Sequence, residues 1–188
     1  LENLLVSANP VSNNLRTINL LGTGQPIIDG QYTSRVLAIE PSNNIILNNL
    51  ILQKGRALNT NPGGAIYNNR SKVSINNTIL RQNRAEGTAY GGGIYNNSGQ
   101  INLISTQLYN NSTSINGGAI YNNFGTANIS QTTFTNNTSN QRGGAIYNYG
   151  SNLSINNSAF NSNTALLDAG VIYNTQAGKL TVVQSTFT

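Results

Sequence analysis

The stretch GGAIYNN, which runs from Gly63 to Asn69, decides the fold because it recurs four more times along the chain. The later copies are GGGIYNN from Gly91, GGAIYNN from Gly117, GGAIYNY from Gly143 and AGVIYNT from Ala169. The tyrosines of the five copies are separated by 28, 26, 26 and 26 residues. A unit that recurs at a fixed period of about 20–50 residues is typical of a solenoid, in which each unit packs on the next.

A second pattern lies between these copies. It consists of two apolar residues in alternation, a polar corner, a further apolar residue and an asparagine three positions later, most clearly as Leu153, Ile155, Asn157, Phe160 and Asn163. Alternation of Ile, Val, Tyr and Phe between Gly- and Asn-rich corners indicates short strands. Helix formers are sparse, so the sequence predicts no helix.

We therefore predict an all-β fold, a right-handed single-stranded parallel β-helix (β-solenoid) with three short strands per coil. At about 26 residues per coil, the chain would form roughly six to seven coils, each strand pairing with its counterpart one repeat later, about 4.8 Å away. We expect the coils to span residues 11–188 and residues 1–10 to form an N-terminal cap. The 188 residues are expected to be a fragment of a longer chain.

Stacking turns each position of the repeat into a column along the coil axis. We expect two apolar columns to form the core, namely Ile75, Leu103, Ile129, Ile155, Val182 and Leu80, Leu108, Phe134, Phe160, Phe187. We expect two asparagine columns at corners, where Asn tolerates left-handed backbone angles and its amide both donates and accepts hydrogen bonds. They are Asn68, Asn96, Asn122, Asn148, Asn174 and Asn83, Asn111, Asn137, Asn163.

Composition restricts the classes of function. Only 8% of the residues are charged, there are 35 asparagines, and the formal net charge is +5. The chain has no cysteine and no histidine, which excludes disulfides and thiolate metal sites. It also has no run of 18 apolar residues, so no membrane span is expected in this segment. The glycine pairs lack the pattern of a phosphate-binding loop, and we expect no cofactor and no metal.

The acidic residues argue against an enzyme. Polysaccharide hydrolysis requires two carboxylates at a fixed separation, and calcium-dependent lyases require a carboxylate cluster. The repeat alignment spreads the five acids over different coils and faces: Glu2, Asp29, Glu40, Glu86 and Asp168. We therefore expect no catalytic residue, and we expect Asp168 to form an ion pair with Arg142 one repeat earlier.

Two groups of residues are candidates for surface contact. Ile66 and Tyr67 have opposite parity; we favour Ile inward, which leaves an outward stripe of Tyr67, Tyr95, Tyr121, Tyr147 and Tyr173. The stripe offers a carbohydrate-contact surface, or alternatively supports the fold by stacking. The second group is a basic patch of Lys54, Arg56, Arg81 and Arg84. It can attract an anionic polysaccharide, or alternatively is a solvated edge; without interleaved aromatics it does not indicate nucleic-acid binding.

The repeats resemble a known family. GGAI at Gly63, Gly117 and Gly143, with FxxN at Phe134–Asn137 and Phe160–Asn163, resembles the motif pair of chlamydial polymorphic outer membrane proteins and related bacterial surface β-helices. The resemblance covers residues 11–188 and implies an extracellular or cell-surface location in a bacterium. It implies no functional residue.

From these observations we expect a structural or adhesive segment of a bacterial surface protein. It would be a rigid rod, or a fibre subunit that associates end to end or with other surface components. The alternatives are a carbohydrate-binding or polysaccharide-processing β-helix and an ice-binding β-solenoid. An ice-binding face is disfavoured because the outward column is irregular: Ile79, Gln107, Thr133, Ala159 and Thr186.

Overall fold

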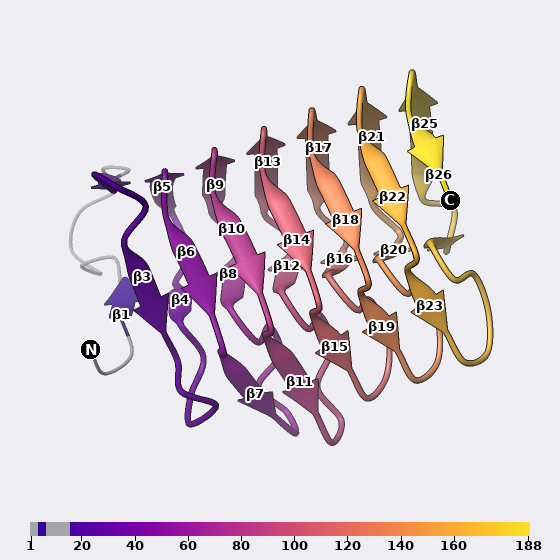
Figure 1. Ribbon diagram of the computed structural model, residues 1–188, viewed down its shortest axis with the longest axis horizontal. Coiled ribbons are helices and arrows are strands. Elements are labelled where there is room, and N and C mark those ends of the chain that lie inside the picture. The colour runs from indigo at the N-terminus through magenta and orange to yellow at the C-terminus, as the bar shows by residue number, and fades with distance from the viewer. Residues whose placement is uncertain (1–3, 7–15) are drawn as a thin grey trace.

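The computed structural model describes residues 4–6 and 16–188 as a stack of coils (Figure 1). The chain winds into a β-solenoid of about 6 turns with about 27 residues per turn. The strand pairings between coils are parallel, which confirms the predicted all-β solenoid. These described residues contain no helix, and so none long and apolar enough to cross a membrane.

The strands form four sheets that run along the coil axis. Sheet 1 contains β1 (Leu4–Val6), β4 (Leu37–Ile39), β8 (Ile66–Asn69), β12 (Ile94–Asn97), β16 (Ile120–Asn123), β20 (Ile146–Tyr149) and β24 (Ile172–Thr175). Sheet 2 contains β2 (Arg16–Leu21), β5 (Asn43–Asn48), β9 (Lys72–Asn76), β13 (Gln100–Ile104), β17 (Thr126–Ser130), β21 (Asn152–Asn156) and β25 (Lys179–Val183). Sheet 3 contains β3 (Ile27–Asp29), β6 (Ile51–Gln53), β10 (Ile79–Arg81), β14 (Gln107–Tyr109), β18 (Thr133–Thr135), β22 (Ala159–Asn161) and β26 (Thr186–Phe187). Sheet 4 contains β7 (Arg56–Leu58), β11 (Arg84–Glu86), β15 (Ser112–Thr113), β19 (Thr138–Ser139) and β23 (Thr164–Ala165).

A complete coil therefore has four short strands rather than the three expected from the sequence. The third expected stretch is bent in two by a residue with left-handed backbone angles, such as Gln82 at a φ of 56° or Asn136 at a φ of 53°. The bend separates a strand of sheet 3 from a short strand of sheet 4, as between β18 and β19. The apolar pattern does not reveal this bend. Asn137, directly after the bend, is buried, as is Phe134 in the strand before it.

The apolar columns form one continuous core, as predicted. Ile75, Leu103 and Ile155 are fully buried and lie in register across β9, β13 and β21. The rings of Phe134 and Phe160 stack with centroids 4.6 Å apart. In the last coil, Val182 is 39% exposed and Phe187 is 45% exposed, because β25 and β26 each have a neighbouring strand on one side only.

Both predicted asparagine columns are hydrogen-bonded ladders. In sheet 1 each amide nitrogen donates to the amide oxygen of the next coil, at 2.8 Å from Asn96 to Asn122 and 2.9 Å from Asn122 to Asn148. In the second ladder the distances are 3.0 Å from Asn111 to Asn137 and 2.9 Å from Asn137 to Asn163. These bonds satisfy buried amides that would otherwise destabilise the interior.

The expected backbone reason for these asparagines was wrong. None of the ladder asparagines has a positive φ; the left-handed conformation falls on neighbours such as Gln82, just before Asn83, and Ser98, two residues after Asn96. The ladder asparagines are therefore selected by their side-chain amides, and the turn is made by the residue beside them.

The glycine pair before each tyrosine permits a close approach of backbones. A Cβ atom on Gly118 would collide with the carbonyl oxygen of Gly144 in the next coil and with the backbone of Thr138. The preceding Gly117 has a φ of 73°, which suits glycine. The pairs are thus parts of the turn from sheet 4 to sheet 1.

Residues 1–10, the expected cap, lie mostly outside the described residues. Within them, Leu4–Val6 forms β1, which pairs in parallel with β4 at the edge of sheet 1.

Candidate contact surfaces

The tyrosine column lies on the outer side of sheet 1. Ile66, Ile94 and Ile120 are fully buried in the core, so the predicted inward orientation of the isoleucine is confirmed. The tyrosine rings stack along the axis, with centroids 5.2 Å apart for Tyr95 and Tyr121 and 4.8 Å apart for Tyr121 and Tyr147.

The column is more covered than an open stripe would be. Tyr121 is 8% exposed and Tyr147 is 7% exposed, and the ring of Tyr90 packs 4.8 Å from that of Tyr121. Guanidinium groups lie over the rings at both ends, 5.2 Å from Tyr67 for Arg35 and 5.5 Å from Tyr173 for Arg142. The stacking fits the structural alternative, and a role of these tyrosines in ligand contact stays a prediction.

Burial also alters the acidity of the phenols. Desolvation, followed by the neighbouring phenols Tyr67 and Tyr90, raises the pKa of Tyr95 to about 12. Desolvation is also the main cause that raises the pKa of Tyr121 and Tyr147. These side chains are therefore neutral at physiological pH.

The four basic residues come from adjacent coils, as expected from their spacing. Arg56 and Arg84 are register partners in β7 and β11. Two of the four form ion pairs with acids: Lys54 Nζ lies 3.6 Å from Asp29 Oδ2, and Arg56 Nη2 lies 2.8 Å from Glu86 Oε2.

The other two are held by uncharged partners. Arg81 donates to Gln53 Oε1 at 2.8 Å and to the hydroxyl of Tyr109 at 3.0 Å. The guanidinium of Arg84 lies 4.5 Å from the centroid of the Tyr32 ring. The basic patch is thus engaged within the chain, and polysaccharide binding by it stays a prediction.

Asp29 closes this network at the N-terminal side. It accepts a hydrogen bond from Gln53 Nε2 at 2.7 Å, and Gln53 in turn accepts from Arg81. Desolvation alone would raise the pKa of Asp29, but hydrogen bonds from Gln53 and the Gln31 amide and the charge of Lys54 outweigh it and lower the pKa. This network and the Arg56–Glu86 pair were not predicted from the sequence, since Arg56 and Glu86 occupy different positions of the repeat.

The predicted pair of Arg142 and Asp168 is confirmed, with 2.8 Å between Nε and Oδ2. Asp29, Glu86 and Asp168 therefore each contact a cation. Glu2 lies outside the described residues. Over the described part of the chain, no three His, Cys, Asp or Glu side chains gather as a metal-binding group would require.

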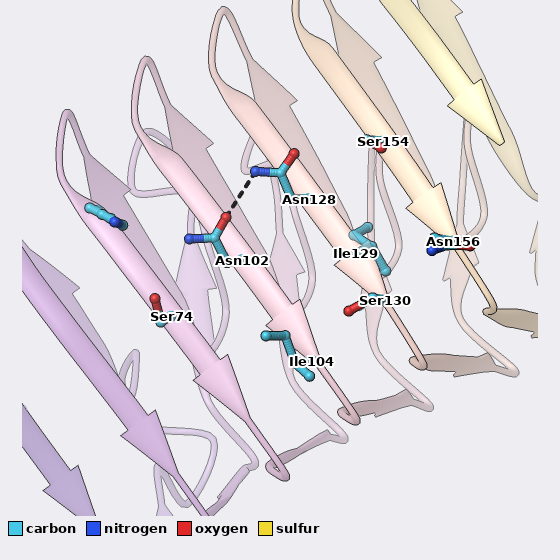
Figure 2. A pocket seen from close by; sticks show the side chains of 9 residues that line it. Ser74, Asn102, Ile104, Asn128, Ile129, Ser130, Ser154 and Asn156 are labelled. Atoms are coloured by element: carbon cyan, nitrogen blue, oxygen red, sulfur yellow. Dashed lines mark hydrogen bonds between the residues drawn. The ribbon is translucent and has the colours of Figure 1, made fainter. Parts of the chain in front are cut away.

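The outer face of sheet 2 carries a shallow polar depression of about 340 Å³ (Figure 2). Ser74, Asn102, Asn128 and Ser154 line it in one outward column, since they are register partners from β9 to β21. Asn128 Nδ2 donates to Asn102 Oδ1 at 2.9 Å. These residues were not among those predicted for surface contact, although their parity, opposite to that of the core column, indicates an outward direction.

A second shallow depression, of about 380 Å³, lies at the corner between sheets 1 and 2. Lys72 lines both depressions. Its polar lining includes Ser42, Arg70, Ser98 and Gln100. At this corner two cations, Arg70 and Lys72, and the hydroxyl groups of Ser42 and Ser98 line the same depression.

Two successive coils are similar to a known repeat. Residues 105–123 and 131–149 match the Chlamydia polymorphic membrane protein repeat. This repeat belongs to a family of bacterial outer membrane proteins, which confirms the resemblance seen in the GGAI and FxxN motifs. Each matched stretch runs from the end of a sheet 2 strand to a strand of sheet 1, from Ser105 to Asn123 and from Gln131 to Tyr149. No curated protein and no solved structure matches the chain.

Proposed function

We propose that this chain is a rigid, non-catalytic segment of a bacterial surface protein with a structural or adhesive role. The observation that carries the proposal is the match of two successive coils to a repeat of outer membrane proteins. The matched coils lie inside an unbroken stack of the same geometry.

The geometry of the stack supports a rod. Successive coils are joined along four sheets, and two internal amide ladders run beside the core. Bending would stretch the hydrogen bonds of several sheets at once and open the core. Such a solenoid holds its outer columns at fixed spacing, which suits display of a contact surface.

Surface display has a direct test. Antibodies raised against the 188-residue chain should label intact cells of the bacterium that carries the parent protein, and protease added to intact cells should remove the label. Labelling that appears only after the cells are permeabilised would contradict the proposal.

The lack of catalysis is also part of the proposal. Three of the described carboxylates are each tied to a cation, rather than paired with a second carboxylate as in glycoside hydrolysis. Incubation of the chain with acidic and neutral polysaccharides should release neither reducing ends nor unsaturated products. Release of either product at a rate proportional to protein concentration would overturn this part.

A fibre is the second form that the rod can take. Leu180, Val182 and Phe187 are partly exposed on the last coil. A further coil of a longer chain would cover them, and so would a second copy of this chain. For the second copy we propose end-to-end association. Electron microscopy of the concentrated chain tests it, and isolated short particles would contradict it.

A further inference from the structure

The corner between sheets 1 and 2 carries features that a rod alone does not require. At this corner each coil from β4 onward has a residue with left-handed backbone angles directly after or near the end of its sheet 1 strand, followed by a second one, Ala177, in the last coil. The first of these residues in each coil together form the corner column. They are Ser42 (φ 65°), Arg70 (φ 49°), Ser98 (φ 51°), Phe124 (φ 48°), Gly150 (φ 55°) and Gln176 (φ 53°). Successive members lie about 4.8 Å apart, the spacing of paired strands.

Arg70 and Phe124, two members of the corner column, have bulky side chains at a position where glycine would fit without strain. The left-handed conformation costs residues other than glycine about 1–2 kcal/mol. Gly150 occupies the same corner as Arg70 and Phe124 and makes the same turn without that strain.

One end of the site is cationic. Arg70 and Lys72 are exposed and line the corner depression together with Ser42, Ser98 and Gln100. Across residues 17–188, no ion pair or side-chain hydrogen bond engages either cation, unlike Lys54 and Arg56. Their charges are therefore available to an anionic ligand.

The other end is aromatic. Phe124 lies two coils beyond Arg70, about 10 Å along the axis at the usual strand spacing, and its side chain is 60% exposed. Its ring meets Tyr149 edge to face at a centroid distance of 5.1 Å. A Cβ atom on Gly150 would lie 2.5 Å from Cε1 of the ring, so glycine at that position leaves room for Phe124. Tyr149 and Gly150 thus pack against one side of the ring, while much of its surface faces solvent.

We propose that the corner column binds an acidic polysaccharide that carries carboxylate or sulfate groups. Arg70 and Lys72 bind an anionic group, with the guanidinium able to form two parallel hydrogen bonds. The hydroxyl groups of Ser42 and Ser98 and the amide of Gln100 bind sugar hydroxyls. The apolar face of a sugar further along the polymer stacks on Phe124.

The separation of the two ends determines the class of ligand. A single small anion would contact Arg70 and Lys72 without reaching Phe124, whereas an extended polymer contacts both ends. An acidic polypeptide would use the same cations, but it has no sugar ring to stack on Phe124. The combination of unpaired cations, hydroxyl groups and one supported aromatic ring therefore favours a polysaccharide.

This inference rests on the proposed function in one respect only, namely that a chain on the cell surface would encounter polysaccharides there. Binding is measured on the purified 188-residue chain, with polygalacturonate as the carboxylate polymer and dextran sulfate as the sulfate polymer. Dextran serves as the neutral polymer and polyglutamate as the acidic polymer without sugar. We expect at least one of the two acidic polysaccharides to bind, and to bind more tightly than dextran and polyglutamate.

Matched variants test each end of the site. Lys72→Gln should weaken binding about threefold to tenfold, whereas Lys179→Gln, the same charge change in the same outward column four coils later, should not. Phe124→Gly should also weaken binding about threefold to tenfold. Gln176→Gly makes the same backbone change two coils further along the corner and should leave binding unchanged.

Folding does not obscure the result, because glycine suits the left-handed angles at residues 124 and 176. The proposal is overturned if neither acidic polysaccharide binds. It is also overturned if polyglutamate binds equally well and Phe124→Gly has no effect, since the site would then be a general anion-binding surface. Neither outcome changes the result of antibody labelling on intact cells, so failure here is distinguishable from failure of the proposed function.

Discussion

At the residue scale, asparagine stabilises this fold because its amide is both a donor and an acceptor. Asn122 accepts a hydrogen bond from Asn96 and donates one to Asn148, and all three are fully buried. A carboxylate in the same column would break this continuity, because it accepts hydrogen bonds but has no proton to donate to the next coil. Asn123, one residue later, points outward and makes a similar bond to Asn97 at 3.0 Å.

The burial of one of these two neighbours leads to a prediction. Asn122→Ala leaves a donor on Asn96 and an acceptor on Asn148 without their partner, so we expect a loss of about 2–4 kcal/mol in the free energy of unfolding. Asn123→Ala should cost less than about 1 kcal/mol, because water can replace the lost bond. Urea denaturation measures both, and equal losses would contradict the role of the buried ladder.

At the element scale, sheets 1 and 2 present different outer faces. Sheet 1 presents a stacked and largely covered tyrosine column, and sheet 2 presents serines and asparagines. The corner between them presents cations and Phe124. Sheet 2 and this corner are therefore candidate contact surfaces in addition to the tyrosine column, whose rings mostly contact one another.

The tyrosine column predicts how stability depends on pH. Folding raises the pKa of Tyr95 to about 12, whereas the same phenol in the unfolded chain has its ordinary pKa of about 10. As the pH rises, Tyr95 therefore loses this proton in the unfolded chain before it does so in the folded chain. Its stabilising contribution is therefore complete below about pH 10 and is lost as the pH rises towards 12. The urea midpoint should fall over this range.

Substitution separates this effect from general alkaline denaturation. Tyr95→Phe combined with Tyr121→Phe keeps the stacked rings but removes two of the phenols with a raised pKa. The fall in the urea midpoint between about pH 10 and 12 should therefore be smaller in the double variant. An identical fall in both proteins would show that these phenols do not cause it.

At the scale of the whole molecule, one continuous core runs through the described coils. A defect in the middle of the stack therefore separates the coils on its two sides. Ile129 is in this core and is register partner of Ile155, whereas Ser154 lies on the outer face of the same sheet.

This difference gives a test of the register. Ile129→Asp places an unpaired carboxylate in the core, and we expect the loss of several kcal/mol, enough to unfold a marginally stable domain. Ser154→Asp keeps the carboxylate in water and should change the free energy of unfolding by less than about 0.5 kcal/mol. Circular dichroism during thermal unfolding distinguishes them, and equal tolerance of both variants would show that the register is wrong.

The sequence by itself determined the coil and its core. A fixed period forces equivalent residues into columns, so the core column with Ile129 and Ile155, the amide ladders and the Arg142–Asp168 pair follow from alignment of the repeats alone. These features depend on the spacing of residues along the chain, which can be read from the sequence.

Only the tertiary structure decided where the chain bends and which outer side chains remain free. Backbone angles at Gln82 or Arg70 leave no trace in an apolar pattern, so the fourth strand and the corner column were not predicted. Pairing across coils, such as Arg56 with Glu86, engages the predicted cations within the chain, whereas within residues 17–188 Arg70 and Lys72 have no such partner. The physical reason is that burial and pairing depend on neighbours from adjacent coils, and on the direction of each side chain at a turn, whereas the repeat period specifies only which residues share a column.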